Sequence, residues 1–170
     1  MRVLVTTDTV TGTWTYTREL VSGLVSQGAR VTLVSFGEIP LPEQISWMGL
    51  LHGLEYRPTA FRLEWMQEGE ADFKDASNYL TGICREQRPD IFHTTQFCFG
   101  TLPVQVPKVV VAQGDLVSWW LAGHGREPKE SRWMRWYRDT VTRGLLGADL
   151  VVAPTQWMQE MLARSYVRPP

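Results

Sequence analysis

Thr11 and Gly12 form a turn near the start of the chain where binding chemistry is expected. They follow the apolar, β-branched residues 2–7 and precede a segment with the apolar spacing of a helix, which Gly28 closes. In a parallel sheet, the turn after the first strand directs the N–H groups of the next helix toward one point, which favours a bound phosphate. Gly12 is expected to supply a positive φ and a close backbone approach. We therefore predict that Thr11 and Gly12 bind substrate.

Two more loops are expected to open at the same edge of the sheet. Residues 90–94 and 108–112 are short and apolar, as is typical of buried parallel strands. The carboxyl ends of such strands meet at one edge, and ligands bind there near the point where the strand order reverses. The loops should therefore join the first turn in one cleft. The residues predicted to bind substrate from these loops are Thr95, Gln96 and Gly114.

Four further side chains each have two interpretations. Gln113 and Asp115 are the candidates for a catalytic role. A glutamine hydrogen-bonds a hydroxyl but takes no proton near neutral pH, and Asp115 either contacts substrate or caps a helix at Leu116. His93, at the end of a predicted strand, is either a substrate contact or a core histidine. His124, between two glycines, is either a substrate contact or a loop residue. We expect no metal site and no cofactor.

The alternation of apolar runs predicts the elements that position these residues. Strands are expected at residues 2–7, 30–36, 51–57, 90–94, 108–112 and 149–153. Helices are expected before Gly28 and at residues 71–88, 116–121, 129–146 and 155–165, and Pro40 and Pro42 mark a loop. This order predicts an α/β fold, a Rossmann-like, doubly wound, mostly parallel sheet with helices on both faces in three layers. The sheet and its covering helices look complete, so we expect the chain to fold.

Composition limits the class of protein. The chain has 170 residues, 44% hydrophobic and 21% charged, which is typical of one globular domain. A net charge of −1 gives no reason to expect a nucleic-acid partner. No apolar run approaches the roughly 20 residues needed to span a bilayer, and the N-terminus has no signal-peptide pattern. Cys84 and Cys98 read as buried thiols, so we expect a cytoplasmic protein.

The predicted helix at residues 129–146 combines aromatic and basic side chains. Trp133, Tyr137, Val141 and Leu145 share one face, and four arginines lie largely on the other. Such surfaces suit sugars, anionic lipid head groups or single-stranded nucleic acid. The alternative is an ordinary amphipathic helix that docks its aromatic face on the sheet, and we favour it because the two faces are well separated.

Several blocks resemble the family 4 glycosyltransferases. Thr7–Tyr16 is similar to the first loop and helix of that family, and Arg88–His93 is similar to its Arg-Pro-Asp-x-x-His strand. Residues 117–120 and 144–155 match further blocks in order, so the resemblance covers nearly the whole chain. Two departures stand out. The family commonly has a second glycine where this chain has Thr11, and a histidine where it has Gln113.

The resemblance implies an architecture and a reaction. Family members have two Rossmann-like domains across a cleft, the glycosyltransferase B architecture, and residues 1–170 would be the N-terminal, acceptor-side domain. A C-terminal domain absent from this chain would bind the nucleotide-diphosphate sugar. The intact protein would be a retaining hexosyltransferase acting on a sugar or sugar-lipid acceptor, with room for peripheral contact at the inner face of a membrane, and this chain alone would be inactive. The alternative is a non-catalytic sugar- or partner-binding module. A nicotinamide dehydrogenase is disfavoured because the first turn lacks GxGxxG.

Overall fold

A computed structural model describes residues 1–166, apart from the side chain of Thr11. Six strands form one sheet in the order β3-β2-β1-β4-β5-β6, and every neighbouring pair is parallel. The strands are β1 (Arg2–Asp8), β2 (Arg30–Phe36), β3 (Leu54–Pro58), β4 (Ile91–Thr94), β5 (Lys108–Val111) and β6 (Leu150–Val152). This confirms the predicted Rossmann-like, doubly wound sheet.

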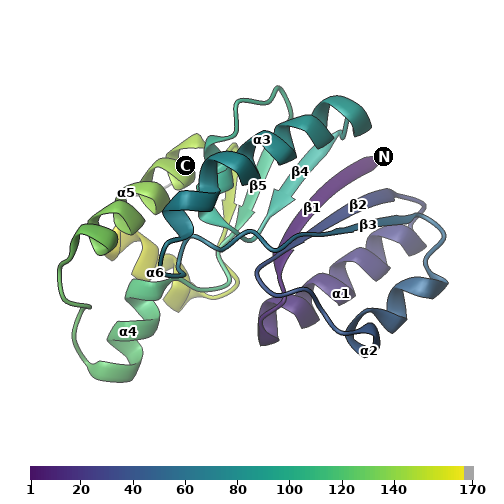
Figure 1. Ribbon diagram of the computed structural model, residues 1–170. Helices are drawn as coiled ribbons and strands as arrows, with labels where there is room; N and C mark the ends of the chain where they lie inside the picture. Colours follow the sequence, from purple (N-terminus) through teal and green to yellow (C-terminus); the bar gives the residue numbers. More distant parts are fainter. Residues whose placement is uncertain (167–170) are drawn as a thin grey trace.

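Helices join the strands and lie on both sides of the sheet, with α3 over one face and α1 over the other (Figure 1). The helices are α1 (Thr11–Ser26), α2 (Pro42–Ile45), α3 (Gly69–Gln87), α4 (Leu116–His124), α5 (Arg132–Gly147) and α6 (Gln156–Ser165). Two 3-10 helices, η1 (Ser46–Leu50) and η2 (Phe97–Thr101), complete the described elements. The sequence did not predict α2, η1 and η2, because segments of four or five residues are too short to show a helical period.

Strand alternation divides the core of the first half into two layers. In β1, Leu4 packs with Leu80 and Ile83 of α3, whereas Val3 and Val5 pack with Val21 of α1. Side chains of successive strand residues point to opposite faces, so an uninterrupted apolar strand serves both layers. Burying a Leu or Val side chain contributes about 1.5–3 kcal/mol, so β1 is held firmly under the loop that follows it.

The second half of the sheet is covered by α5 and α6. Tyr137, Val141 and Leu145 of α5 are buried in one cluster with Leu162 of α6. The aromatic face of α5 therefore docks on the protein interior, as the ordinary amphipathic interpretation predicted. The backbones of α5 and η2 touch, because a Cβ added at Gly144 would overlap the carbonyl oxygen of Phe97.

The edge strand β6 is less well covered than expected. Val151 packs against the cluster beneath α5, but its neighbours Leu150 and Val152 are 50% and 39% exposed. These two side chains alternate with Val151 and so belong to the opposite face of the sheet. The expectation that the covering helices are complete is therefore wrong at β6.

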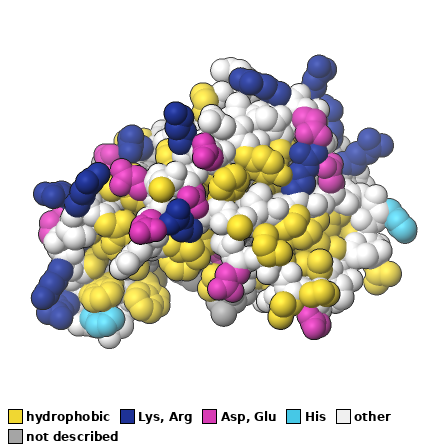
Figure 2. All heavy atoms as spheres, in the orientation of Figure 1, with side chains coloured by type: hydrophobic (Ala, Val, Ile, Leu, Met, Phe, Trp, Pro, Cys, Tyr) yellow, Lys and Arg dark blue, Asp and Glu magenta, His cyan; other side chains and the backbone are white. Residues whose placement is uncertain are grey.

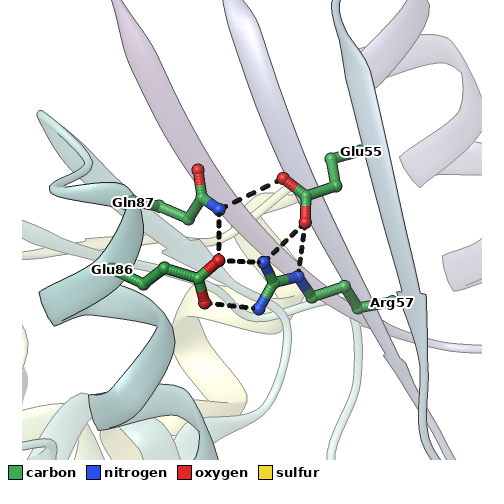
Figure 3. A network of polar contacts seen from close by, with 4 residues as sticks. All are labelled: Glu55, Arg57, Glu86 and Gln87. Carbon is green, nitrogen blue, oxygen red and sulfur yellow. Dashed lines mark hydrogen bonds and ion pairs between the residues drawn. The ribbon is translucent and has the colours of Figure 1, made fainter.

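At the other edge, a polar network attaches β3 to α3 (Figure 3). The two Nη atoms of Arg57 donate to the two carboxylate oxygens of Glu86 at 2.6 and 2.9 Å, and its Nε donates to Glu55 at 2.6 Å. Gln87 donates to both carboxylates. These contacts raise the pKa of Arg57, and the bidentate geometry fixes β3 laterally against the C-terminal end of α3.

Candidate functional site

A cavity of about 550 Å³ opens at the carboxyl edge of the sheet, where the strand order reverses between β1 and β4. The ends of β1, β4 and β5 contribute to its wall, together with the starts of α1 and α4. The predicted site residues that line it are Gly12, Thr95, Gln96, Gln113, Gly114 and Asp115. The structure thus brings together loops that are about a hundred residues apart in the chain, as the topology predicted.

Gly12 lies in the first turn of α1 rather than before the helix. The helix already begins at Thr11, and Gly12 is not among the glycines with positive φ, so the expected positive φ is wrong. Open space surrounds this position, because a Cβ added to Gly12 would meet no atom within 4 Å. The side chain of Thr11, also predicted to bind substrate, lies outside the described residues.

The turn after β4 is held by threonine hydroxyls. Thr6 of β1 donates to Thr94 Oγ1 at 2.7 Å, and Thr94 Oγ1 in turn bonds the backbone N–H and carbonyl of Gln96. Gln96 donates its Nε2 to Thr95 at 2.8 Å, but its Oε1 has no hydrogen-bond partner among the described residues. Gln96 is buried, so an acceptor oxygen is left unsatisfied in the wall of the cavity.

Asp115, after β5, has a structural role that the structure shows directly. Its Oδ1 accepts the N–H groups of Val117 and Ser118 at 2.9 and 3.1 Å, which caps α4. Tyr166 donates its hydroxyl to the same oxygen at 2.6 Å. The second carboxylate oxygen, Oδ2, is buried without a partner among the described residues. Asp115 is therefore both a helix cap and part of the cavity wall.

The sequence did not predict Glu64, which is buried in the same wall. Its Oε1 accepts the backbone N–H of Phe97 at 2.9 Å, and the thiol of Cys98 lies 3.6 Å from Oε2. Burial raises the pKa of Glu64 to about 7, and the nearby charge of Asp8 adds to the rise. Glu64 stands in a non-periodic stretch before α3, and a carboxylate between apolar Leu63 and Trp65 was the only local signal.

Asp8 completes a group of three carboxylates, with Glu64 and Asp115, that line the cavity. Burial raises the pKa of Asp8, although its Oδ1 accepts the N–H of Val10 at 2.9 Å. None of the three forms an ion pair with a described residue, and no Lys, Arg or His lines this cavity in the part of the chain that is described. Across residues 1–166, no cluster of His, Cys, Asp and Glu is arranged to hold a metal ion.

The two histidines predicted as substrate contacts are not among the residues that line the cavity. His93 is buried on β4, where its Nε2 lies 3.1 Å from the hydroxyl of Tyr16, and burial lowers its pKa to about 4. His124 ends α4 on the surface, and its ring stacks on Trp120 with a centroid distance of 4.3 Å. His93 therefore matches the core interpretation of the sequence.

The surface beside the cavity is aromatic and basic. Trp119 of α4 lines the cavity and is 64% exposed. Figure 2 shows hydrophobic side chains beside Lys and Arg over the region of α4. In residues 1–166, every helix falls short of the length and apolar character that a bilayer crossing demands.

Comparison with known proteins gives one family and one fold. Residues 11–170 match the family described as the glycosyl transferase 4-like domain. No curated protein sequence matches the chain significantly. Among solved structures, UGT2 of Phytolacca americana, complexed with UDP-2fluoro-glucose and pterostilbene, superposes with a TM-score of 0.65 at 11% identity. That match covers 94% of this chain and 49% of the other.

Two further structures give the same result. UGT89C1 of Arabidopsis thaliana, complexed with quercetin, has a TM-score of 0.62 at 12% identity, covering 98% of this chain and 48% of that one. A ugt transferase from Siraitia grosvenorii in complex with UDP has a TM-score of 0.56 at 12% identity, covering 96% and 48%. At this identity the likeness establishes the fold, and the chain spans about half the length of each of these structures.

Proposed function

The chain belongs to the glycosyl transferase 4-like domain family, and from this premise we propose that it is the acceptor-side half of a retaining, nucleotide-sugar-dependent hexosyltransferase. The observation that carries the proposal is the cavity of about 550 Å³ at the reversal point of the strand order. Ligands of doubly wound sheets bind at this point, and the cavity is large enough for a sugar-sized molecule. The family supplies the reaction class, and the cavity supplies the place.

In this proposal, a second Rossmann-like domain outside residues 1–170 binds the donor. The chain spans only 49% of the UGT2 structure, which is described as complexed with UDP-2fluoro-glucose. The start of α1 would face the donor diphosphate, because its first N–H groups have no side-chain cap and border the cavity. The leaving diphosphate gains negative charge as the anomeric bond breaks, so oriented N–H groups there stabilise the transition state.

The chain's own residues would orient the acceptor. Gln113 lines the cavity at the end of β5 and is half-buried, so its amide can bond a hydroxyl without exchanging a proton. Asp115, fixed by its contacts to α4 and Tyr166, presents a rigid carboxylate beside it. Holding the acceptor hydroxyl in line with the donor carbon lowers the barrier by restricting relative motion.

A sugar-lipid is one acceptor that suits this arrangement. Trp119 stands exposed at the mouth of the cavity, and Arg126 and Lys129 follow α4 in the chain. Aromatic and basic side chains together favour a membrane surface with anionic lipids. We therefore keep a cytoplasmic protein with peripheral contact at the inner face of a membrane as part of the proposal, with no role for nucleic acid.

The test of the proposal fills the open space at Gly12. In the complete gene product, Gly12→Val places a branched side chain where a Cβ meets no atom within 4 Å, so folding should tolerate it. We expect the transfer rate to fall at least about tenfold, since a misplacement of ligand by a side chain's width costs this much or more. The thermal midpoint should stay within a few degrees of the wild-type value.

The matched control is Gly23→Val. Gly23 lies on the same helix with the same open surroundings, but it does not line the cavity. It should leave both rate and stability nearly unchanged. Equal losses of rate and stability in Gly12→Val would reduce Gly12 to a structural position. Sugar binding without any transfer by the complete gene product would favour the non-catalytic binding module.

A further inference from the structure

The cavity is acidic in a way that the proposed reaction does not explain. Asp8, Glu64 and Asp115 line it and are only 8%, 5% and 5% exposed. Buried carboxylates are normally paired with cations, because moving a charge out of water is costly. These three have no ion pair among the described residues, and the lining contains no Lys, Arg or His there. The compensating positive charge is therefore missing from the chain itself.

Hydrogen bonds satisfy these carboxylates only in part. Asp115 receives three donors on Oδ1 and none on Oδ2, and Gln96 receives none on Oε1. Gln96 is 2% exposed and belongs to the same wall. Both unsatisfied atoms are acceptors, so the cavity wall lacks N–H or O–H donors and not acceptors. A ligand rich in donors would supply what the wall lacks.

Aromatic side chains define the shape of the ligand. Trp65 and Trp119 line the cavity and are 37% and 64% exposed, so their ring faces are available at its mouth. Such faces pack on the C–H surface of a saturated ring and also attract cations. The wall thus combines flat apolar surfaces with carboxylates and amide oxygens.

We propose that the acceptor is an amine-bearing polyol ring, with its ammonium group held among Asp8, Glu64 and Asp115 and its ring against Trp65 and Trp119. The proposal rests on the proposed function and adds the charge class of the acceptor to it. An ammonium group donates three hydrogen bonds and compensates the carboxylate charge. Acceptors with a phosphate or carboxylate are excluded, because they would meet like charge at short range in a partly dry cavity.

The experiment compares three methyl glucosides that differ only at C6. Methyl glucoside carries a neutral hydroxyl there, its 6-amino-6-deoxy analogue an ammonium group, and methyl glucuronide a carboxylate. Each is titrated into the full chain while the indole N–H signals of the tryptophans are followed by NMR. We expect the amine to bind at least about tenfold more tightly than the neutral glucoside, as one charge-assisted hydrogen bond allows, and the glucuronide not to bind. Equal or tighter binding of the glucuronide overturns the proposal, as does the absence of saturable binding by all three.

Two isosteric variants locate the preference. Glu64→Gln and Asp8→Asn keep size and remove charge, so each should reduce the advantage of the amine over the neutral glucoside several-fold while leaving the neutral affinity within about twofold. Asp75→Asn, at an exposed position on α3, is the control and should change neither affinity. An amine preference that survives both variants assigns the effect to another part of the surface and overturns the proposal.

The outcome is separable from that of the proposed function. If the amine preference is found but the complete gene product transfers no sugar, the acidic ligand site stands and the transferase proposal fails. If the gene product transfers sugar to neutral or anionic acceptors without an amine preference, the transferase proposal stands and the acceptor class assigned here is wrong.

Discussion

Glu64 and His93 are buried groups whose titrations act on stability in opposite directions. Burial raises the pKa of Glu64 from 4.5 to about 7, so the folded protein holds a proton that the unfolded chain has lost in this range. Its stabilising effect is complete below pH 4.5 and is lost as the pH rises to about 7. Burial lowers the pKa of His93 from 6.5 to about 4, so its effect is complete above pH 6.5 and is lost as the pH falls.

Because the two windows overlap, the prediction concerns a difference between variants. Glu64→Gln replaces the carboxyl with a neutral group of the same shape, so it removes the Glu64 contribution and leaves that of His93. Relative to wild type, the variant should gain up to about 3 kcal/mol in free energy of unfolding between pH 4.5 and pH 8. Urea unfolding across this range is the measurement, with the exposed Glu38→Gln as control. A pH-independent difference would mean that Glu64 titrates normally.

Gln113 allows a test of the departure from the family histidine. Gln113→His introduces at the cavity wall a group that titrates near neutral pH. If Gln113 orients the acceptor, the complete gene product should show a changed rate and a new pH dependence between about pH 6 and 8. Steady-state kinetics over this range is the measurement. An unchanged profile and rate would show that this side chain has no contact with either substrate.

Residue by residue, the sequence predicted the parts of the site that follow strands. Gln96 and Asp115 were found because β4 and β5 are short apolar runs with clear ends. Glu64 was missed because its segment has no periodicity and its place depends on a bond to Phe97, which is 33 residues away. Such a contact is set by tertiary packing, which a local pattern does not contain. His93 shows the converse, since a titratable type on a strand end is no proof of a site.

At the scale of elements, the close approach of α5 and η2 positions one wall of the cavity. A Cβ at Gly144 would overlap the carbonyl oxygen of Phe97, and a backbone atom cannot rotate away as a side chain does. Phe97 also donates its N–H to Glu64, so a shift of η2 would move the carboxylate. The packing of two backbones thus determines the geometry of a site residue.

We expect Gly144→Ala to lower the free energy of unfolding by about 1–3 kcal/mol, although alanine favours helix more than glycine does. Gly82→Ala in α3 is the matched control, since its Cβ meets no atom within 4 Å, and it should stabilise the protein by up to about 1 kcal/mol. Chemical unfolding of both variants decides between them. A neutral or stabilising Gly144→Ala would show that α5 and η2 can separate without cost.

The longer elements followed from the sequence, but their ends and short neighbours did not. The apolar spacing of Ala76, Leu80 and Ile83 predicted α3, and these side chains are buried in its interface. The third strand begins at Leu54 rather than residue 51, because Leu51 and Leu54 close a turn through a backbone hydrogen bond of 3.1 Å. A turn of this kind contains the same apolar residues as a strand, so composition does not separate the two.

At the scale of the whole molecule, two features point to a larger assembly. Leu150 and Val152 are partly exposed on β6, and the cavity is walled only by the residues of this one domain. The chain also spans about half the length of the structures that share its fold. A donor-binding domain across the cavity would give the nucleotide contacts that this chain does not provide, as the proposed function requires.

The last prediction concerns what this chain binds alone. A helix N-terminus contributes roughly 0.3–1 kcal/mol to anion binding, and about 2 kcal/mol when partly buried. A millimolar dissociation constant already needs about −4 kcal/mol. The carboxylates of Asp8 and Glu64 beside α1 repel a diphosphate, and no described cation in the cavity wall offsets them. The start of α1 therefore cannot hold a nucleotide-sugar by itself, and residues 1–170 should bind uridine, guanosine and adenosine diphosphate-sugars with dissociation constants above about 1 mM and show no turnover. Calorimetric and NMR titration with all three donors is the direct measurement. Micromolar binding of any of them, or turnover by this chain alone, would show that the donor site lies within these residues.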